Sequence, residues 1–194
     1  MSFKKELAFF LYDNQIIKFG NFMLSSGINS DFYVDIRMLY SYPNQFRKVV
    51  HRLLNIINDQ IGLENFDCFT AIPTSGLILT SALAFESMKP LIYVRNDNKS
   101  HGTSKSIEGH TFHNMKTIIV DDVITTGQTI ENNIKALNKN NIIITGIYTI
   151  INRSVSDNEF IKSSKISTHE VIHINEVFQY LNTTDPRFNI GKLR

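Results

Sequence analysis

The sequence has one cysteine, almost no net charge and no long apolar run, and each of these features excludes a class of protein. Cys68 has no second cysteine with which to form an intrachain disulfide. Its position in the apolar run from Phe66 to Ile72 favours a buried structural thiol over a nucleophile. The formal net charge of +2, with Lys and Arg scattered along the chain, gives no support for binding to nucleic acid or to an anionic membrane.

Membrane and export signals are also absent from the sequence. No apolar stretch approaches the roughly 20 residues of a membrane-spanning helix. The first residues include an early acid, Glu6, and lack the apolar region and small-residue cleavage site of a signal peptide. We therefore expect a soluble, cytoplasmic protein that has neither nucleic acid nor membrane as a partner.

The length of 194 residues and the hydrophobic content of 42% suit one domain with a sizeable core. We expect a single domain over residues 1–194. Within it, residues 1–40 would form a helix and a β-hairpin, residues 66–153 a ligand-binding core, and residues 183–194 a tail.

The spacing of apolar residues predicts an α/β fold. Helical spacing is seen near the N-terminus, at Phe3, Leu7 and Leu11, and again after Pro43. Two short strand-like runs lie between these helices. From Phe66 onward, predicted strands and helices alternate, which is typical of a central, mostly parallel sheet flanked by helices. The strands are expected at 22–24, 32–34, 66–72, 91–94, 116–120, 142–151 and 170–174, and the later helices at 77–87, 130–140 and 176–181, with a long polar loop over 95–115.

Residues 118–129 carry the strongest chemical signal. The apolar residues Ile118 to Val120 predict a strand that is buried on both faces and stops at two acids, Asp121 and Asp122. A loop of hydroxyls and one glycine follows, and a helix is expected to begin near Thr129 or Ile130. Backbone N–H groups, hydroxyls and the helix dipole suit a phosphate, and adjacent carboxylates suit the hydroxyls of a sugar. This pattern predicts a site for a ribose 5-phosphate.

The same stretch resembles the phosphoribosyl pyrophosphate (PRPP) motif of the type I phosphoribosyltransferases. The matching residues are Val120, Asp121, Asp122, Val123, Ile124, Thr125, Thr126 and Gly127. An ordinary strand-to-helix turn is the alternative interpretation of these residues. The motif is also found in PRPP synthases and in regulators that bind PRPP without turning it over, so it does not by itself indicate catalysis.

The region before the core resembles the N-terminal hood of the orotate phosphoribosyltransferase family. Residues 18–37 match it at Gly20, Phe22, Leu24, Ser26, Gly27, Ser30, Tyr33 and Asp35. The resemblance implies that the hood covers the base and that backbone groups near Tyr33 and Val34 contact it. A peripheral hairpin that only packs on the core is the alternative.

The polar segment from Arg95 to Gly109 resembles the mobile catalytic loop of the same family. Pyrophosphate leaves as a polyanion, so cations must meet the charge as it develops. Arg95 can bind phosphate oxygens in a bidentate manner, Lys99 adds a positive charge, and His101 can donate a hydrogen bond or a proton. The resemblance implies a homodimer in which this loop reaches the neighbouring subunit's site.

Two further segments fit the family pattern, with some departures. Residues 71–77 occupy the place of the pyrophosphate-binding loop, and Arg153 lies where the family has an arginine that pairs with the carboxylate of orotate. Ser25, Thr74 and Asn96 stand where many members have lysine, and Asn152 stands where an acid commonly precedes the arginine. We expect these departures to affect the reaction rate and the affinity for PRPP more than the identity of the family.

Taken together, the resemblance implies Mg²⁺-dependent transfer of ribose 5-phosphate from PRPP to orotate, which gives orotidine 5′-monophosphate and pyrophosphate. Lys99, His101, Asp121 and Asp122 would be catalytic. PRPP would be bound by Arg95, Lys99, His101, Asp121, Asp122, Val123, Ile124, Thr125, Thr126, Gly127, Gln128 and Thr129, and orotate by Thr125, Arg153, Tyr33 and Val34. Mg²⁺ would be held mainly through PRPP and water, without a protein metal site. A transferase for another base and a PRPP-binding regulator remain as alternatives.

Overall fold

The computed structural model describes residues 2–23, 29–95, 106–153 and 159–183, and these divide into two compact units. One unit comprises Met1–Phe46 together with Ile172–Arg194, and the other comprises Arg47–Val171. Ser25, Asn96, Lys99 and His101, and the tail after residue 183, lie outside the described residues. The assignment of residues 1–194 to a single domain stays a prediction.

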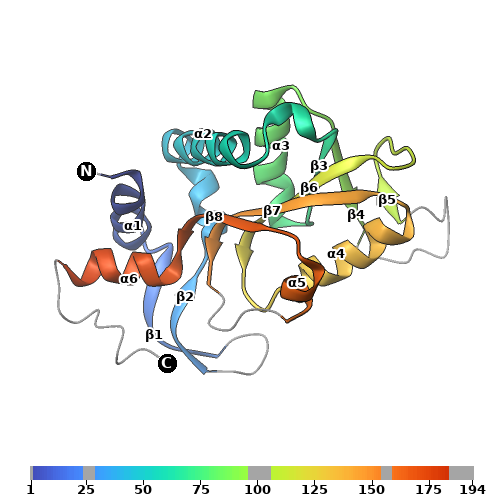
Figure 1. Cartoon of the computed structure of the whole chain (residues 1–194). Coiled ribbons are helices and arrows are strands. Elements are labelled where there is room, and N and C mark those ends of the chain that lie inside the picture. The colour runs from blue at the N-terminus through green and yellow to red at the C-terminus, as the bar shows by residue number, and fades with distance from the viewer. Residues whose placement is uncertain (1, 24–28, 96–105, 154–158, 184–194) are drawn as a thin grey trace. The chain divides into compact units, whose positions relative to one another are not determined.

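The larger unit is built on a six-stranded sheet with the order β5-β4-β3-β6-β7-β8 (Figure 1). Helices α2 and α3 lie over one face of this sheet, and α4 and α5 lie over the other. The strands are β3 (Cys68–Ala71), β4 (Leu91–Val94), β5 (Ile107–Glu108), β6 (Lys116–Ile124), β7 (Ile143–Asn152) and β8 (Thr168–His173), and the helices are α2 (Pro43–Gln60), α3 (Ser75–Ser87), α4 (Gln128–Lys139) and α5 (Glu159–Ser164), with a short 3-10 turn, η2 (Leu63–Asn65), before β3.

The helical connections after β3 and after β6 run in opposite directions along the sheet, which makes a topological switch point between these two neighbouring strands. Strand β3 pairs in parallel with both β4 and β6, and β6 pairs in parallel with β7. The chain passes from β3 through α3 to β4 on one side, and from β6 through α4 to β7 on the other. Open α/β sheets bind ligands at the carboxyl ends of the strands at such a point.

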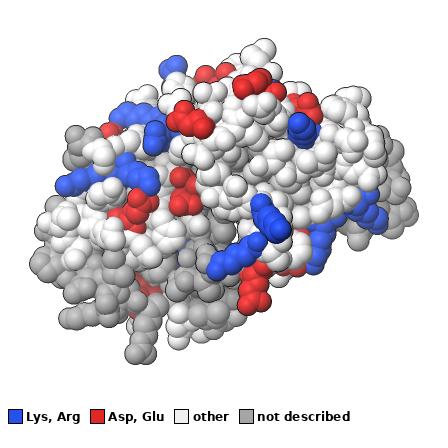
Figure 2. Space-filling model, in the orientation of Figure 1, with Lys and Arg blue, Asp and Glu red and all other residues white. Residues whose placement is uncertain are grey.

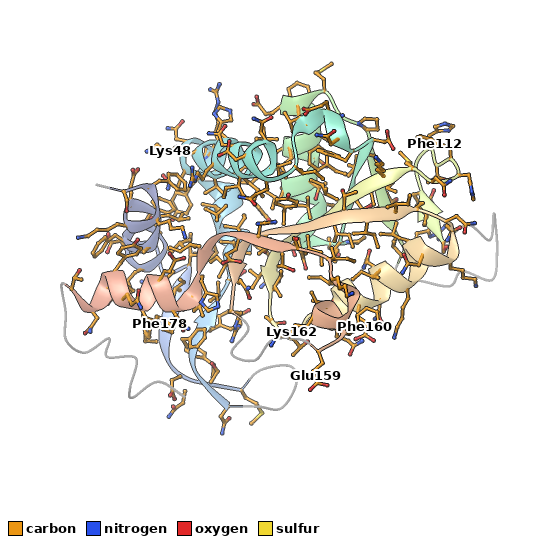
Figure 3. The ribbon with its side chains drawn as sticks, viewed as in Figure 1. Lys48, Phe112, Glu159, Phe160, Lys162 and Phe178 are labelled. Atoms are coloured by element: carbon orange, nitrogen blue, oxygen red, sulfur yellow. The ribbon has the colours of Figure 1, made fainter. Side chains whose placement is uncertain are left out.

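Burial explains why the central strands and helices form where they do. Ile118, Ile119 and Val120 of β6 are fully buried, as expected for a parallel strand covered on both faces. Helix α4 buries Ile130, Asn133, Ile134 and Leu137, which recur at helical spacing. On α5, Phe160 lies 5.2 Å from Lys135 Nζ of α4, measured to the ring centroid (Figure 3).

Cys68 is fully buried in β3, which confirms the prediction of a structural thiol. Its Sγ donates to Thr117 Oγ1 at 3.4 Å. Burial disfavours the thiolate and raises the pKa of the Cys68 thiol to about 11. The side chain is therefore a neutral part of the core at physiological pH.

The smaller unit contains α1 (Phe3–Asp13), the hairpin of β1 (Ile17–Met23) and β2 (Asn29–Val34), the 3-10 turn η1 (Ile36–Ser41) and α6 (Ile174–Asn182). Strands β1 and β2 are antiparallel, which confirms the predicted hairpin, although β1 is longer than the run 22–24. Phe178 of α6 packs on the hairpin, with ring centroids 5.5 Å from Phe19 and 5.0 Å from Phe32 (Figure 3). Lys4 of α1 forms an ion pair with Glu176 of α6 at 2.7 Å.

Several predicted boundaries were wrong. Strand β6 does not stop at Val120 but continues to Ile124, so both acids lie inside the strand. The polar stretch after β4 contains a two-residue strand, β5, that pairs antiparallel with β4. Helix α3 begins at Ser75, two residues before the predicted start. The sequence pattern also gave no indication of α5.

The surface charge and the helices match two expectations from the sequence, scattered charge and the lack of a membrane-spanning run. Lys and Arg side chains are interspersed with Asp and Glu on the face shown in Figure 2. Among the described helices, none combines the length and apolar character needed to cross a bilayer.

Candidate functional site

An acid pair lies at the carboxyl end of β6, beside the switch point. Asp121 and Asp122 are buried, with 8% and 5% of their surfaces exposed. The N–H of Asp122 donates to Asp121 Oδ1 at 2.9 Å, and the N–H of Val123 donates to Asp122 Oδ1 at 2.9 Å. Each carboxylate is thus fixed by the backbone of the next residue, which orients the pair before any ligand binds.

The acid pair is electrostatically unusual. Burial, and next the negative charge of Asp122, raise the pKa of Asp121 well above its usual range. Buried carboxylates of this kind need hydrogen-bond donors or positive charge nearby. The hydroxyl groups of a sugar and a developing positive charge on its ring both meet that need.

The loop after β6 presents hydroxyls and a helix N-terminus next to the acids. Thr125, Thr126 and Thr129 are exposed. Gly127 is the N-cap residue of α4, with a φ of 74° that favours glycine and no side-chain cap. The cap residue therefore offers no side-chain acceptor, and the N–H of Gln128 makes only a long hydrogen bond of 3.4 Å to Thr126 Oγ1. An exposed helix N-terminus of this kind suits a phosphate. This confirms the predicted loop and places the start of α4 at Gln128.

The N-terminus of a second helix, α3, packs directly on the acid pair. A Cβ added to Gly76 would lie 3.0 Å from Asp121 Oδ1 and 3.3 Å from the carbonyl oxygen of Val120. The N-cap residue of α3, Thr74, also makes no side-chain capping bond. Two helix N-termini therefore lie at the same edge of the sheet as the acids, and residues 71–77 are close to the PRPP motif in space.

Arg153 lies at the end of β7, at the same edge. Its N–H donates to the carbonyl oxygen of Ile124 at 2.9 Å, and Asn152 is opposite Ile124 in the β6–β7 ladder. The side chain of Arg153 is half-buried. The fold thus brings this arginine next to the loop of threonines that follows Ile124.

Arg95 directly follows β4 and is held by β5. Its N–H donates to the carbonyl oxygen of Ser106 at 2.9 Å, and its Nη1 lies 3.0 Å from Glu108 Oε1. The sequence pattern placed Glu108 at the end of the predicted catalytic loop, within Ile107-Glu108-Gly109, but gave it no role. A single acid in a polar stretch is usually a solvated side chain, and its pairing with Arg95 depends on the fold.

The proposed base-contacting residues of the hood lie on β2, in the smaller unit. Tyr33 packs its ring 5.7 Å from that of Phe22 on β1. Arg37 donates to both carboxylate oxygens of Asp35, at 2.6 and 3.0 Å, and to the Tyr33 hydroxyl at 3.5 Å. The hydrogen bond and charge of Arg37 lower the pKa of Asp35.

The acid pair also offers oxygen ligands to a magnesium ion. The described residues contain no group of three or more His, Cys, Asp or Glu side chains placed to share a metal. The two carboxylates of β6 are hard oxygen ligands of the type that Mg²⁺ prefers, and Mg²⁺ commonly binds through few protein ligands, substrate phosphates and water. These residues fit a metal that arrives with a phosphorylated substrate.

Comparison with known proteins decides the family. A family model described as "Phosphoribosyl transferase domain" matches residues 37–182. The chain belongs to the phosphoribosyltransferase family. The sheet order, the flanking helices and the separate hairpin confirm the predicted type I phosphoribosyltransferase fold.

The name orotate phosphoribosyltransferase recurs among the proteins similar to this chain. The chain is 35% identical over 182 residues to the orotate phosphoribosyltransferase of Cenarchaeum symbiosum, covering 94% of this chain and 91% of that protein. The crystal structure of orotate phosphoribosyltransferase from Aeropyrum pernix has a TM-score of 0.80 and 28% identity, covering 91% of this chain and 98% of that chain. The structure of Leishmania donovani UMP synthase has a TM-score of 0.81 and 26% identity, covering 95% of this chain but 39% of that chain.

Proposed function

We propose that this phosphoribosyltransferase is specific for orotate and transfers the ribose 5-phosphate of PRPP to it, which gives orotidine 5′-monophosphate and pyrophosphate. The observation that supports the transfer best is the buried acid pair of β6 beside the N-termini of α3 and α4. The name orotate phosphoribosyltransferase, carried by a relative that is 35% identical over 94% of this chain and by the similar Aeropyrum pernix structure, supports orotate as the base. The product belongs to pyrimidine nucleotide biosynthesis.

The loop that follows β6 holds the sugar phosphate in this proposal. Thr125, Thr126 and Thr129, with the N–H groups of Gly127 and Gln128, bind the 5-phosphate at the positive end of α4. Val123 and Ile124 contribute backbone groups at the end of β6. Asp121 and Asp122 accept hydrogen bonds from the ribose hydroxyls.

The reaction is a displacement at the anomeric carbon. The bond to pyrophosphate breaks, the bond to the base nitrogen forms, and positive charge develops on the sugar ring between these events. Two buried carboxylates beside the ring stabilise that charge strongly, because the surroundings have a low dielectric constant. Arg95, Lys99 and His101 stabilise the departing pyrophosphate. When it is bound with PRPP, Mg²⁺ supplies further charge neutralisation on the pyrophosphate.

Arg153 selects the base in this proposal. Orotate carries a carboxylate that neutral bases lack, and a half-buried guanidinium at the end of β7 attracts it. Thr125 and the backbone of Tyr33 and Val34 complete the contacts to orotate.

We propose that the enzyme works in the cytoplasm as a homodimer, with the loop from Arg95 to Gly109 completing the neighbouring subunit's site. An apolar stripe on α3 supports association. Ile78 and Phe85 lie on one side of the helix, and Met88 directly follows it, with exposed fractions of 47%, 79% and 87%. Exposed apolar side chains in such a row are a frequent mark of a protein interface.

The loss of orotate absorbance on addition of PRPP and Mg²⁺ tests this proposal. We expect turnover of orotate that requires Mg²⁺ and falls strongly in Lys99→Ala, with adenine and hypoxanthine left unconsumed. Turnover of a purine instead would assign the chain to another base. If PRPP binds but no base is consumed, the chain is a PRPP-binding regulator and the catalytic proposal is wrong.

A further inference from the structure

We infer that Glu108 is a positioning residue that holds the guanidinium of Arg95 in place for pyrophosphate. The inference rests on the proposed function, in which Arg95 meets the pyrophosphate of PRPP. It gives a role to Glu108, a residue of the loop from Arg95 to Gly109 that the family resemblance leaves without one.

The geometry shows a fixed pair at the base of the loop. Arg95 Nη1 lies 3.0 Å from Glu108 Oε1, and the two side chains are 24% and 37% exposed. The backbone is joined at the same point, because the N–H of Arg95 donates to the carbonyl oxygen of Ser106 at 2.9 Å. Arg95 is therefore held through its backbone by Ser106 and through its side chain by Glu108 of β5.

The register of β5 places Glu108 where it can reach Arg95. Tyr93 is opposite Glu108 and Val94 is opposite Ile107 in the antiparallel pair. Ile107 is buried in the core at 6% exposure. Adjacent side chains of a strand point to opposite faces, so burial of Ile107 turns the carboxylate of Glu108 away from the core.

The residue after Glu108 fixes this register. Gly109 has a φ of +105°, and a Cβ there would lie 2.8 Å from Ile92 Cγ2 and 3.0 Å from the carbonyl oxygen of Leu91. The chain can leave β5 in this direction only with a glycine at this position. Ile107 on one side and Gly109 on the other thus hold Glu108 in place.

Stability is a poor explanation for the pair, because a partly exposed ion pair contributes little to folding. Its effect on binding is larger. An arginine that is already ordered loses less side-chain entropy when it binds an anion. A single carboxylate oxygen engages Nη1, and the planar guanidinium has further N–H groups that can donate to phosphate oxygens.

Steady-state kinetics of Glu108→Ala and Glu108→Gln test the inference. We expect Glu108→Ala to raise KM for PRPP on the order of tenfold, the effect of losing one charge-assisted hydrogen bond, with kcat and KM for orotate near wild type. Glu108→Gln keeps an acceptor oxygen and should recover most of the affinity. Glu86→Ala removes a carboxylate of similar exposure that lies 3.7 Å from His51 Nε2 in the same unit, and it is the matched control.

A double-mutant cycle separates positioning from a general structural effect. In the background of Arg95→Ala, removal of Glu108 should have no further effect on KM for PRPP. Equal effects of Glu108→Ala in both backgrounds, or an unchanged or lowered KM in the single variant, would overturn the inference. Direct calorimetric titration with PRPP keeps the test independent of turnover. A wild-type protein that binds PRPP but consumes no base contradicts the proposed function alone, whereas equal PRPP affinity of wild type and Glu108→Ala contradicts this inference alone.

Discussion

At the residue scale, the acid pair shows how the proposed binding site conflicts with folding. Asp121 sits in the interior of a central strand, where an apolar residue would be the stable choice. Its carboxylate is retained at 8% exposure, beside a second acid. Such a position is explained by a ligand that supplies hydroxyl donors and positive charge.

Replacement of Asp121 by Asn should therefore stabilise the free protein and weaken the enzyme. Because burial raises the pKa of Asp121 in the folded state above the unfolded value of 3.8, the folded state binds the proton more tightly. The wild type loses stability as pH rises from the unfolded pKa through the folded pKa, and Asn removes that loss. The amide oxygen can still accept from the N–H of Asp122.

Thermal unfolding of wild type and Asp121→Asn across pH 4 to 8 measures this effect. We expect a higher Tm for the variant at pH 8 and converging values near pH 4. A chain of this size gains roughly 2–4 °C per kcal/mol. In the same variant, kcat/KM should fall on the order of a hundredfold, since a group aimed at developing charge is lost. A variant that is less stable than wild type at pH 8 would refute the role of burial.

At the element scale, the position of α3 matters as much as its residues. Glycine in a helix normally costs about 0.5–1 kcal/mol relative to alanine. Gly76 in the first turn of α3 is explained by its close approach to Asp121 and Val120. The helix N-terminus can meet the acid pair only where no side chain intervenes.

Gly76→Ala should lower kcat/KM for PRPP on the order of tenfold or more, because a small displacement of an aligned group is costly. The change in stability should be small, since the gain in helix propensity offsets the new contact. Glu86→Ala, at an exposed position on the same helix but away from the side that carries Ile78 and Phe85, is the control and should leave kinetics unchanged. Wild-type kinetics in Gly76→Ala would show that α3 does not position the acids.

The elements also show what the sequence could and could not predict. Alternating apolar runs predicted most of the central strands and helices, and the Thr-Thr-Gly loop after the acids was placed correctly. The end of β6 was wrong because acids usually mark a strand's end, whereas here burial by the surrounding fold keeps Asp121 and Asp122 within the ladder. Strand β5 was missed because two residues are too few for a periodic pattern, and its pairing with β4 depends on contacts across the loop.

At the scale of the whole molecule, long-range contacts join the two ends of the chain. Lys4 and Glu176 form their ion pair across 172 residues, and α1 and α6 belong to the same compact unit as the hairpin. Local sequence patterns predict α1, α6 and the hairpin one by one, but they do not predict that these elements pack together. The proposed homodimer with a shared loop likewise rests on the family resemblance and not on a local sequence pattern.

A mixing experiment tests whether the loop acts across a dimer. Lys99→Ala removes a loop cation and Asp122→Asn alters the acid pair, so each homodimer should be nearly inactive. After subunit exchange, mixed dimers would have one site with both groups intact. We expect about one quarter of wild-type activity, because half of the dimers are mixed and each has one working site of two.

The two variants mixed without time for exchange are the control for this experiment. If exchange is shown by a mass difference between tagged subunits and activity does not return, the loop serves its own subunit's acids. That result would contradict the shared site while leaving the transferase function intact.

The lone thiol of Cys68 has a practical consequence for studying the loop from Arg95 to Gly109. The thiol is fully buried and its pKa is about 11, so at pH 7.5 well under roughly one molecule in a thousand carries the reactive thiolate. A cysteine introduced at the surface would therefore react with a maleimide dye selectively, and Cys68 could stay in place. A single fluorescent reporter could be attached to the otherwise native sequence, and ligand-driven movement could be followed in solution in real time.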